Sequence, residues 1–245
     1  MRAFLKYLGI QFRMDLRDRG VLMTYYLVPL VFYVVVGSVF SSTNPLMKPT
    51  LAASMSIFAI SMGAVMGTPI PIVRAREAGT LRAFRVNGIP GAATLGVQAV
   101  SAFLHLLLVS ALIYAVSPAL LHAAWPSFPA RYAAVLLIFL AATVGVGLLI
   151  GACARSQQAA TMLSMLVFFP SVLLGGIMFP ASMLPGALRG VGEIFPATQA
   201  MRAFAGMAYG GRDGGAGTAL AVLSAMGLLA FALACLCFAR QLRDE

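Results

Sequence analysis

Six long apolar stretches constrain this chain more than any other feature of its sequence. Each is near the roughly 20 residues that a helix needs to cross a bilayer. They run approximately over residues 21–40, 51–73, 91–117, 132–152, 159–178 and 216–239. A composition that is 61% hydrophobic and only 10% charged excludes an ordinary soluble domain. We therefore predict an all-α integral membrane protein with six transmembrane helices and a single domain over residues 1–245.

Residues 1–20 differ from the apolar stretches because basic and apolar side chains are interspersed. On a helical wheel the apolar residues fall on one side and the basic residues beside them. The apolar set is Phe4, Leu5, Leu8, Phe12 and Leu16, and the basic set is Arg2, Lys6, Arg13, Arg17 and Arg19. This pattern predicts an amphipathic helix at the membrane surface, with its basic residues toward anionic lipid. The alternative is an unstructured tail that only carries charge. The apolar run that follows is too long for a signal-peptide core, so we expect it to be retained as the first span.

The basic residues are distributed unevenly between the loops. If the N-terminus is cytoplasmic, twelve Lys and Arg residues lie on the inner side and five on the outer side. Positively charged loops usually remain in the cytoplasm. We therefore expect a multi-pass protein of the cell (plasma or inner) membrane with both termini cytoplasmic. The net charge of +10 is explained by this placement and requires no nucleic-acid partner.

Small residues recur at helical spacing in two of the spans. Gly63 and Gly67 form one pair, and Gly147 and Gly151 form another. Such pairs let helices approach closely. Because about two pairs are expected by chance among 24 glycines, we do not treat them as a dimerisation motif.

Ionisable chemistry is sparse in the predicted spans. All seven carboxylates lie outside them, and His105 is the one histidine well inside a span. Ion-driven carriers usually place ionisable groups at membrane depth, so this pattern disfavours a proton-coupled carrier. His105 either relays protons or bonds to a neighbouring helix. The cysteines Cys153, Cys235 and Cys237 lie in apolar settings typical of packing. We expect no catalytic residue and no metal site.

The chain also lacks the motif that it would need to take energy from a nucleotide by itself. A Walker A loop needs a lysine directly after glycine. The two lysines are Lys6, which follows Leu5, and Lys48, which follows Met47. Uphill transport by this chain therefore requires energy from another subunit.

The segment from Arg74 to Pro90 is a candidate contact for such a subunit. It contains four arginines and Glu77 between the second and third apolar stretches. Residues 77–84 could form one short amphipathic helix with Leu81 and Phe84 on the same face, presented to a partner. Alternatively, the arginines only fix the topology.

Residues 159–201 begin as an apolar helix that repeatedly meets helix-breaking residues. The breaks are Pro170, Gly175, Gly176, Pro180, Pro185 and Pro196. Proline removes a backbone donor, and glycine has low helix propensity. Because the segment remains apolar after the breaks, we predict a span followed by short, half-buried helices before the final crossing.

Together these features resemble the permease subunits of ABC transporters of the type-2 exporter class. The resemblance covers essentially the whole chain and rests on two motifs. The first is E-x-G-T-L after the second span, at Glu77, Gly79, Thr80 and Leu81. The second follows the fifth span and consists of Phe179–Pro180, Leu184–Pro185, and Pro196 with Thr198.

The resemblance implies a half-transporter that pairs with a second permease copy, identical or different, and with a separate ABC ATPase subunit. ATP and Mg would bind the ATPase, and this chain would hold no cofactor. Residues 1–20 would be the connecting helix. Coupling to the ATPase would involve Glu77, Gly79, Thr80, Leu81 and Phe84. A re-entrant hairpin between the fifth and sixth helices would include Phe179, Pro180, Leu184, Pro185 and Pro196.

The expected cargo is a drug-like, lipid or other amphipathic compound. Candidate pathway residues are the small polar and aromatic side chains Thr24, Tyr25, Ser54, Ser61, Ser164 and Phe168. A glycan exporter of the same class is an alternative, although the spans offer no basic residue to a phosphate. An ATP-independent carrier or a structural membrane protein is the alternative from another class.

Overall fold

The computed structural model describes residues 2–43, 50–86, 88, 90–121, 123–177, 183–211 and 215–244. Six helices or helix series within these residues are long and apolar enough to cross a membrane. They are Arg19–Phe40, Leu51–Glu77, Ala93–Leu121, Pro129–Cys153, Gln157–Leu174 and Ala216–Arg240. The predicted all-α membrane fold with six spans is confirmed.

The first two spans each consist of several helical segments. The elements before the third span are α1 (Arg2–Asp15), α2 (Arg19–Leu22), η1 (Met23–Leu27), α3 (Val28–Thr43), α4 (Leu51–Met62), η3 (Gly63–Gly67), α5 (Pro69–Glu77) and α6 (Thr80–Val86). The later elements are α7 (Gly91–Leu121), α8 (Pro129–Cys153), α9 (Gln157–Leu174), α10 (Gly186–Gly192), α11 (Pro196–Ala203), η5 (Phe204–Ala208) and α12 (Ala216–Asp244).

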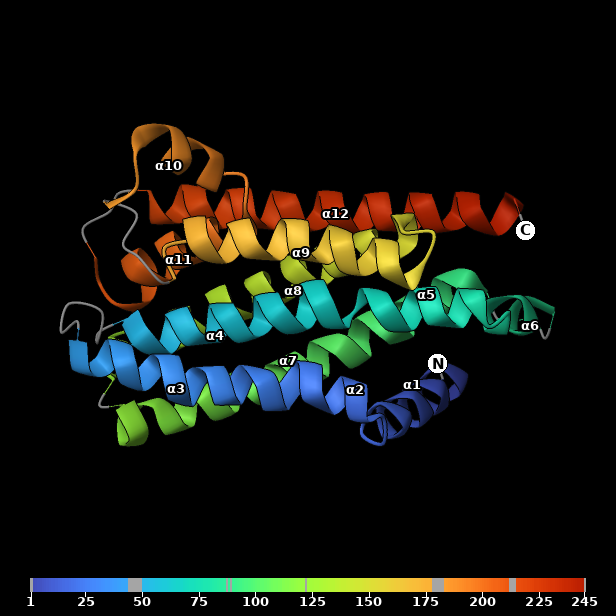
Figure 1. Cartoon of the computed structure of the whole chain (residues 1–245), viewed down its shortest axis with the longest axis horizontal. Helices are drawn as coiled ribbons and strands as arrows, with labels where there is room; N and C mark the ends of the chain where they lie inside the picture. The colour runs from blue at the N-terminus through green and yellow to red at the C-terminus, as the bar shows by residue number, and fades with distance from the viewer. Residues whose placement is uncertain are drawn as a thin grey trace.

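The bundle is elongated, and its two ends carry different short helices (Figure 1). Helices α1 and α6 lie at one end, which we call the α1 end, together with both chain termini. Helices α10 and α11 lie toward the opposite end, which we call the α10 end. An even number of spans accounts for the two termini being on the same side.

The second span, α4–η3–α5, is the most enclosed helix of the bundle. It is 78% buried, whereas the sixth span, α12, is only 17% buried. Helix α4 carries no charged residue and is buried around its whole circumference, as expected of a helix that contacts protein on all sides. It packs against α3, α7, α9 and α11. On α12, by contrast, Leu228 and Leu229 remain 74% and 62% exposed. The second span is therefore the centre of the protein, and α12 lies at its periphery.

Glycines allow the closest helix contacts. A Cβ on Gly147 of α8 would lie 2.1 Å from the carbonyl oxygen of Ala64 in η3. A Cβ on Gly227 of α12 would lie 2.7 Å from the Cα of Ala142 in α8. Backbones approach this closely only where the side chain is absent. The pair at Gly147 and Gly151 thus serves packing within the chain.

A π-helical turn of the first span, η1, packs against a π-helical turn of the second span, η3. The ring of Tyr25 in η1 covers Gly63 and Gly67 of η3, where added Cβ atoms would lie within 3.2 Å of it. The Tyr25 hydroxyl lies 3.1 Å from Thr68 Oγ1, which satisfies both buried hydroxyls. These turns join the first span to the central helix.

Two helices continue through a proline, and both end at positions other than the predicted span boundaries, α7 later and α9 four residues earlier than residue 178. Helix α7 passes through Pro118 and ends at Leu121 rather than at residue 117. Helix α9 passes through Pro170 and ends at Leu174, with Gly175 as its C-terminal cap. Packed neighbours and local polar groups satisfy the backbone groups that proline leaves unpaired in such helices.

Aromatic side chains gather near the α10 end, where α8 begins. Trp125 in the loop before α8 is 59% exposed, and its ring meets that of Tyr114 edge-on at 5.4 Å. Tyr114 also lies 4.9 Å from Tyr132, whose hydroxyl is 3.2 Å from Ser56 Oγ. The cluster therefore links α7 and α8 to the central α4.

We predict that Gly147→Ala destabilises the bundle by about 1 to 3 kcal/mol, because the new methyl group must displace the Ala64 backbone. Thermal unfolding of the purified protein in detergent measures this change. Gly9→Ala is the matched control, since no atom lies within 4 Å of a Cβ at Gly9 in α1. Equal melting temperatures for the two variants would contradict the close contact between α8 and η3.

Candidate functional site

The candidate site at the α1 end is a helical hairpin formed by α5 and α6 (Figure 1). Helix α5 ends at Glu77, and α6 begins at Thr80. Between them Gly79 has a φ of +70°, a left-handed conformation that glycine adopts without strain. The expected single helix from Glu77 to Phe84 is therefore wrong. Two helices meet at Gly79, and we call residues 77–80 the coupling turn.

The apolar face of α6 points into the protein. Leu81 is only 6% exposed and belongs to the main hydrophobic core. Phe84 is half-buried, and its ring meets that of Tyr7 in α1 edge-on at 5.7 Å. The prediction that Leu81 and Phe84 face a partner is thus wrong, because α1 and the core already cover them. The outward side of α6 carries Val86, which is 82% exposed.

The coupling turn is bonded to the start of α9. Both carboxylate oxygens of Glu77 accept hydrogen bonds from Gln157, one from its backbone N–H at 3.2 Å and one from its side-chain amide at 2.6 Å. A carboxylate at a helix N-terminus is also favoured by the helix dipole. The guanidinium of Arg76 donates to the carbonyl of Ala154 in the same connection. The end of the second span is therefore connected to the beginning of the fifth.

Helix α1 packs on α7 through a buried polar cluster. Asp15 is 6% exposed and accepts hydrogen bonds from Ser101 Oγ at 2.6 Å and from Gln11 Nε2 at 2.8 Å. The fully buried His105 places Nε2 3.6 Å from Asp15 Oδ2 and Nδ1 2.6 Å from the Tyr26 hydroxyl. The interpretation of His105 as bonded to a neighbouring helix is confirmed by Tyr26. We call Asp15, Tyr26, Ser101 and His105 the histidine cluster.

The charge of Asp15 is stabilised despite its burial. Desolvation raises the pKa of this carboxyl, but His105, Ser101 and Gln11 together lower it by more, so its pKa lies below the usual value. The sequence placed no carboxylate inside a span, and Asp15 lies in α1, outside the spans. Its contact with His105 of the third span was not predicted. The sequence held one clue, because Asp15 follows Phe12 by three residues and therefore shares its face of α1. In the structure the Phe12 ring stacks on His105 at 4.3 Å.

Residues 2–15 form a helix, which excludes the alternative of an unstructured tail. Its contact face differs in part from the expected apolar face. Phe4, Leu8 and Phe12 are half-buried, whereas Leu5 and Leu16 are 60% and 44% exposed. The wheel grouped these residues, but packing on α7 selects only one side of the group. An orientation of α1 along the membrane surface stays a prediction.

The candidate pathway residues are directed mainly into the protein's own packing. Ser164 donates a 2.6 Å hydrogen bond to the Val65 carbonyl, and Ser54 lies 3.7 Å from the sulfur of Met201. Thr24 donates to the carbonyl of Gly20 at 2.9 Å. Tyr25, Ser61 and Phe168 are also buried, at 2%, 2% and 6% exposure. Their lining of a pathway stays a prediction.

Helices α10 and α11 begin at the predicted proline breaks. Pro185, which follows the half-buried Leu184, is the N-terminal cap of α10, and Pro196 opens α11. Phe179 and Pro180 lie outside the described residues. The two short helices match the expected interruption of the chain, and their re-entry into the membrane stays a prediction.

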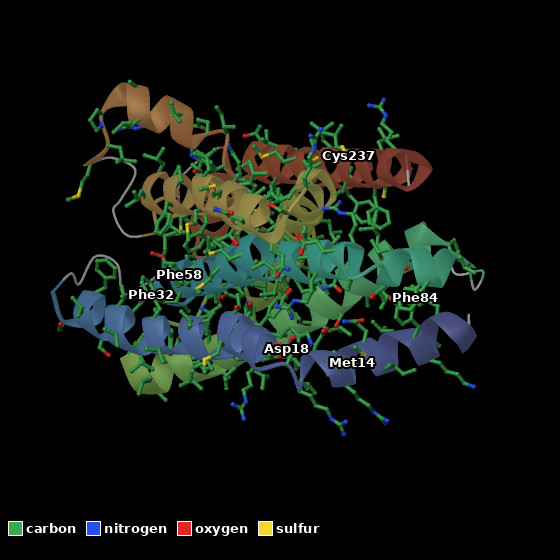
Figure 2. The ribbon with its side chains drawn as sticks, turned by 45° about the vertical axis from the view of Figure 1, so that its right-hand side comes forward. Met14, Asp18, Phe32, Phe58, Phe84 and Cys237 are labelled. Atoms are coloured by element: carbon green, nitrogen blue, oxygen red, sulfur yellow. The ribbon has the colours of Figure 1, made fainter. Side chains whose placement is uncertain are left out.

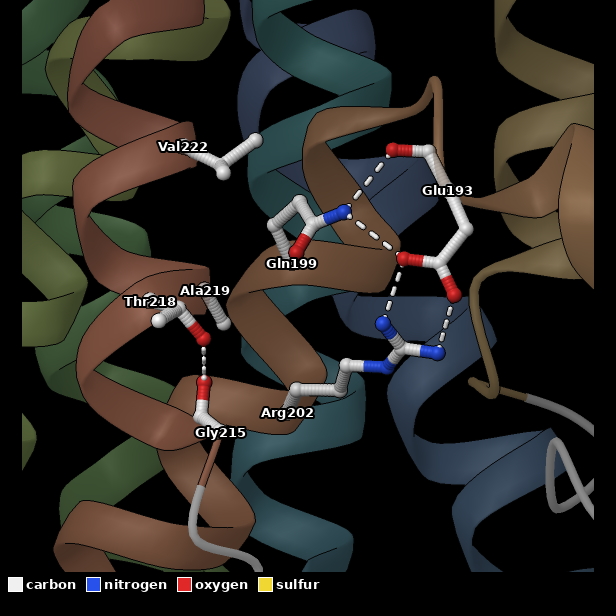
Figure 3. A pocket seen from close by; sticks show the side chains of 7 residues that line it. All are labelled: Glu193, Gln199, Arg202, Gly215, Thr218, Ala219 and Val222. Atoms are coloured by element: carbon white, nitrogen blue, oxygen red, sulfur yellow. Dashed lines mark hydrogen bonds and ion pairs between the residues drawn. The ribbon is translucent and has the colours of Figure 1, made fainter.

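A cavity of about 300 Å³ between α11 and α12 is lined by a second set of polar side chains besides the histidine cluster (Figure 3). Arg202 donates to both carboxylate oxygens of Glu193. Gln199 donates to the Glu193 carbonyl at 2.8 Å and to its carboxylate at 3.2 Å. Because these groups bond to one another, they brace the segment between α10 and α11.

No group of three or more His, Cys, Asp or Glu side chains is placed to hold a metal ion in the part of the chain that the structure describes.

Six spans with a helical hairpin at one end define a multi-pass membrane protein. The ABC-2 type transporter family matches residues 4–209, from α1 through η5, and the chain belongs to this family. The resemblance to a permease subunit is thereby confirmed. No curated protein matches the sequence. The family implies an ABC ATPase partner and a permease component that is not itself catalytic.

We predict that Asp15→Asn loosens α1 from α7 and lowers stability by about 1 to 3 kcal/mol, because a charged hydrogen-bond acceptor is lost from a buried site. Trypsin cleavage at Arg13 and Arg17, with thermal unfolding, measures this effect. Because the pKa of Asp15 is lowered by folding, its stabilisation is complete at neutral pH and is lost as the pH falls below about 4.

Asp18→Asn is the control for this experiment. Its ion pair with Arg74 at 3.2 Å is solvent-exposed, and asparagine can still cap α2, so a smaller effect is expected. Equal protection of α1 in the wild type and in Asp15→Asn would contradict the role of the histidine cluster.

Proposed function

We propose that this permease is the membrane-spanning subunit of an ATP-driven exporter. With a second permease copy it forms the path for a drug-like, lipid or other amphipathic compound. The observation that carries the proposal is the coupling turn, which ends the central second span and bonds to the start of the fifth. A force applied at this turn acts on two spans together.

The proposed orientation places the α1 end in the cytoplasm of a cell or inner membrane. The exposed basic side chains of α1 and Arg74 at this end support it. Basic residues close to span ends are retained on the cytoplasmic side. The ATPase, which binds ATP and Mg, then approaches the coupling turn directly.

We propose that the ATPase contacts the outward side of α6 around Val86, because Leu81 and Phe84 are covered by the chain itself. Displacement of α6 moves α5 across Gly79. The bonds from Glu77 to Gln157 and from Arg76 to Ala154 transmit the displacement to α9. ATP hydrolysis on the partner subunit supplies the energy, and this chain converts it into movement of spans.

The fifth span offers an apolar surface for the second copy and the substrate. Met162, Leu166 and Phe169 of α9 are 64%, 69% and 54% exposed. An amphipathic substrate suits such a surface better than a charged glycan, which remains the second candidate within the same class.

A double-mutant cycle tests transmission through the coupling turn. Glu77→Ala, Gln157→Ala and the double variant are reconstituted in liposomes with the ABC ATPase subunit, and ATP turnover and efflux of an amphipathic dye are measured. We expect each single variant to reduce efflux per ATP about fivefold, equivalent to about 1 kcal/mol, and the double variant to lose no more than either single one. Additive losses would show that Glu77 does not act through Gln157. Efflux without the ATPase would favour an independent carrier.

A second test addresses the docking surface. Val86→Glu introduces a charge on the outward side of α6 and is expected to weaken ATPase binding about tenfold or more in a pull-down. Val191→Glu is the matched control, because Val191 in α10 is also exposed, at 48%, but lies at the opposite end. Unchanged binding of Val86→Glu would place the ATPase contact elsewhere.

A further inference from the structure

A cavity of about 730 Å³ lies at the α1 end between α1, α5, α6 and α7. Its volume is within the range of about 300 to 1,000 Å³ that is common for small-molecule sites. Figure 2 shows Met14, Asp18 and Phe84, three of its lining residues, around this part of the molecule. The coupling turn contributes Ala78 and Thr80 to the wall, so an occupant contacts the segment that we propose to receive the ATPase stroke.

The deep part of the cavity is lined by apolar side chains that are themselves buried in the protein. Its deep wall is formed by Ile72, Leu81, Leu95 and Phe238, which are 3% to 6% exposed. Val21, in the first turn of the first span, also lines it. The apolar surface therefore continues from the point where the chain enters the bilayer. An apolar lining of this kind suits a single hydrocarbon chain.

The cavity opens to the surroundings along α1. Ile10 and Met14 line it and yet remain 58% and 59% exposed. An apolar rim of this kind is normal where lipid, rather than water, covers the surface. The position favours a membrane lipid over a soluble metabolite.

Two basic and two acidic side chains line the cavity, and the basic pair offers contacts to an anionic headgroup. Lys6 from α1 and Arg74 from α5 both line the cavity, and both are exposed. The two lining carboxylates are occupied, since Asp15 is bonded within the histidine cluster and Asp18 accepts from the backbone of α2 and from Arg74. Lys6 has no ion pair among the residues that the structure describes. Basic pockets on the cytoplasmic side of membrane proteins bind phosphate headgroups.

We propose that this cavity binds one anionic phospholipid of the adjoining leaflet. One acyl chain fills the apolar space, and the phosphate is bound by Lys6 and by Arg74, whose guanidinium also pairs with Asp18. The bound lipid bridges α1 and α5, and it supports the coupling turn from the side opposite the outward face of α6. The site goes beyond the proposed transport function, because binding requires neither the ATPase nor a substrate.

The test is native mass spectrometry of the full chain after extraction from vesicles of equimolar phosphatidylglycerol and phosphatidylcholine. We expect one retained phosphatidylglycerol per chain. Neutralisation by Lys6→Gln with Arg74→Gln is expected to lower retention about fivefold for each charge removed. The matched control is Arg13→Gln with Arg17→Gln, which removes two positive charges from α1 and the turn after it, at positions that do not line the cavity. Equal loss in both double variants would show diffuse surface attraction and overturn the proposal.

A second variant keeps both charges and fills the space. Gln98→Trp, on the α7 wall, is expected to abolish retention while the protein still elutes as a folded species. Soluble glycerol phosphate is not expected to displace the lipid, because it lacks the acyl chain. Displacement by it would identify a free phosphate site, and equal retention of phosphatidylcholine would identify an apolar site. Either result contradicts the proposal. Because the ATPase is absent, failure here leaves the coupling mechanism untouched.

Discussion

The enclosure of the second span by its neighbours is the constraint on which the rest of the structure depends. Gly147 lets α8 lie directly on the Ala64 backbone, and the Tyr25 ring fills the space above Gly63 and Gly67. A helix packed on all sides cannot tilt without moving the helices around it, since protein interiors respond as close-packed solids. The coupling turn is attached to the end of this helix, so displacement there is transmitted through the bundle.

Three carboxylates form hydrogen bonds that hold helices in a fixed relation. The histidine cluster holds α1 on α7, Glu77 holds α5 to α9, and Glu193 with Arg202 holds the segment before α11. In an apolar surrounding a polar side chain without a partner is costly, so each contact specifies one arrangement. Two of the three lie at the α1 end. This end is therefore specified by charged contacts, whereas the middle of the bundle is held by close packing and by hydrogen bonds of neutral side chains, such as Tyr25 with Thr68.

The sequence predicted the spans because hydrocarbon thickness fixes their length, and it predicted breaks at Pro185 and Pro196 because proline is restricted wherever it occurs. The coupling segment was found through its motif and its charge. The direction of Leu81 was not found, because periodicity identifies an apolar face but cannot say whether the same chain or another covers it. Asp15 was missed for a related reason. A helical wheel contains no information about Ser101 and His105, which only the folding of α1 onto α7 brings near. Pro118 within α7 shows that a breaker marks the end of a helix reliably only where water is available.

The position of Trp125 has a spectroscopic consequence. It is the single tryptophan of the chain, and it lies near the α10 end beside Tyr114. Intrinsic fluorescence excited in the tryptophan band therefore reports from the side of the membrane opposite the coupling turn. A change in emission when the ATPase binds at α6 would be a direct optical record of a signal that has crossed the bundle, obtained without any introduced label.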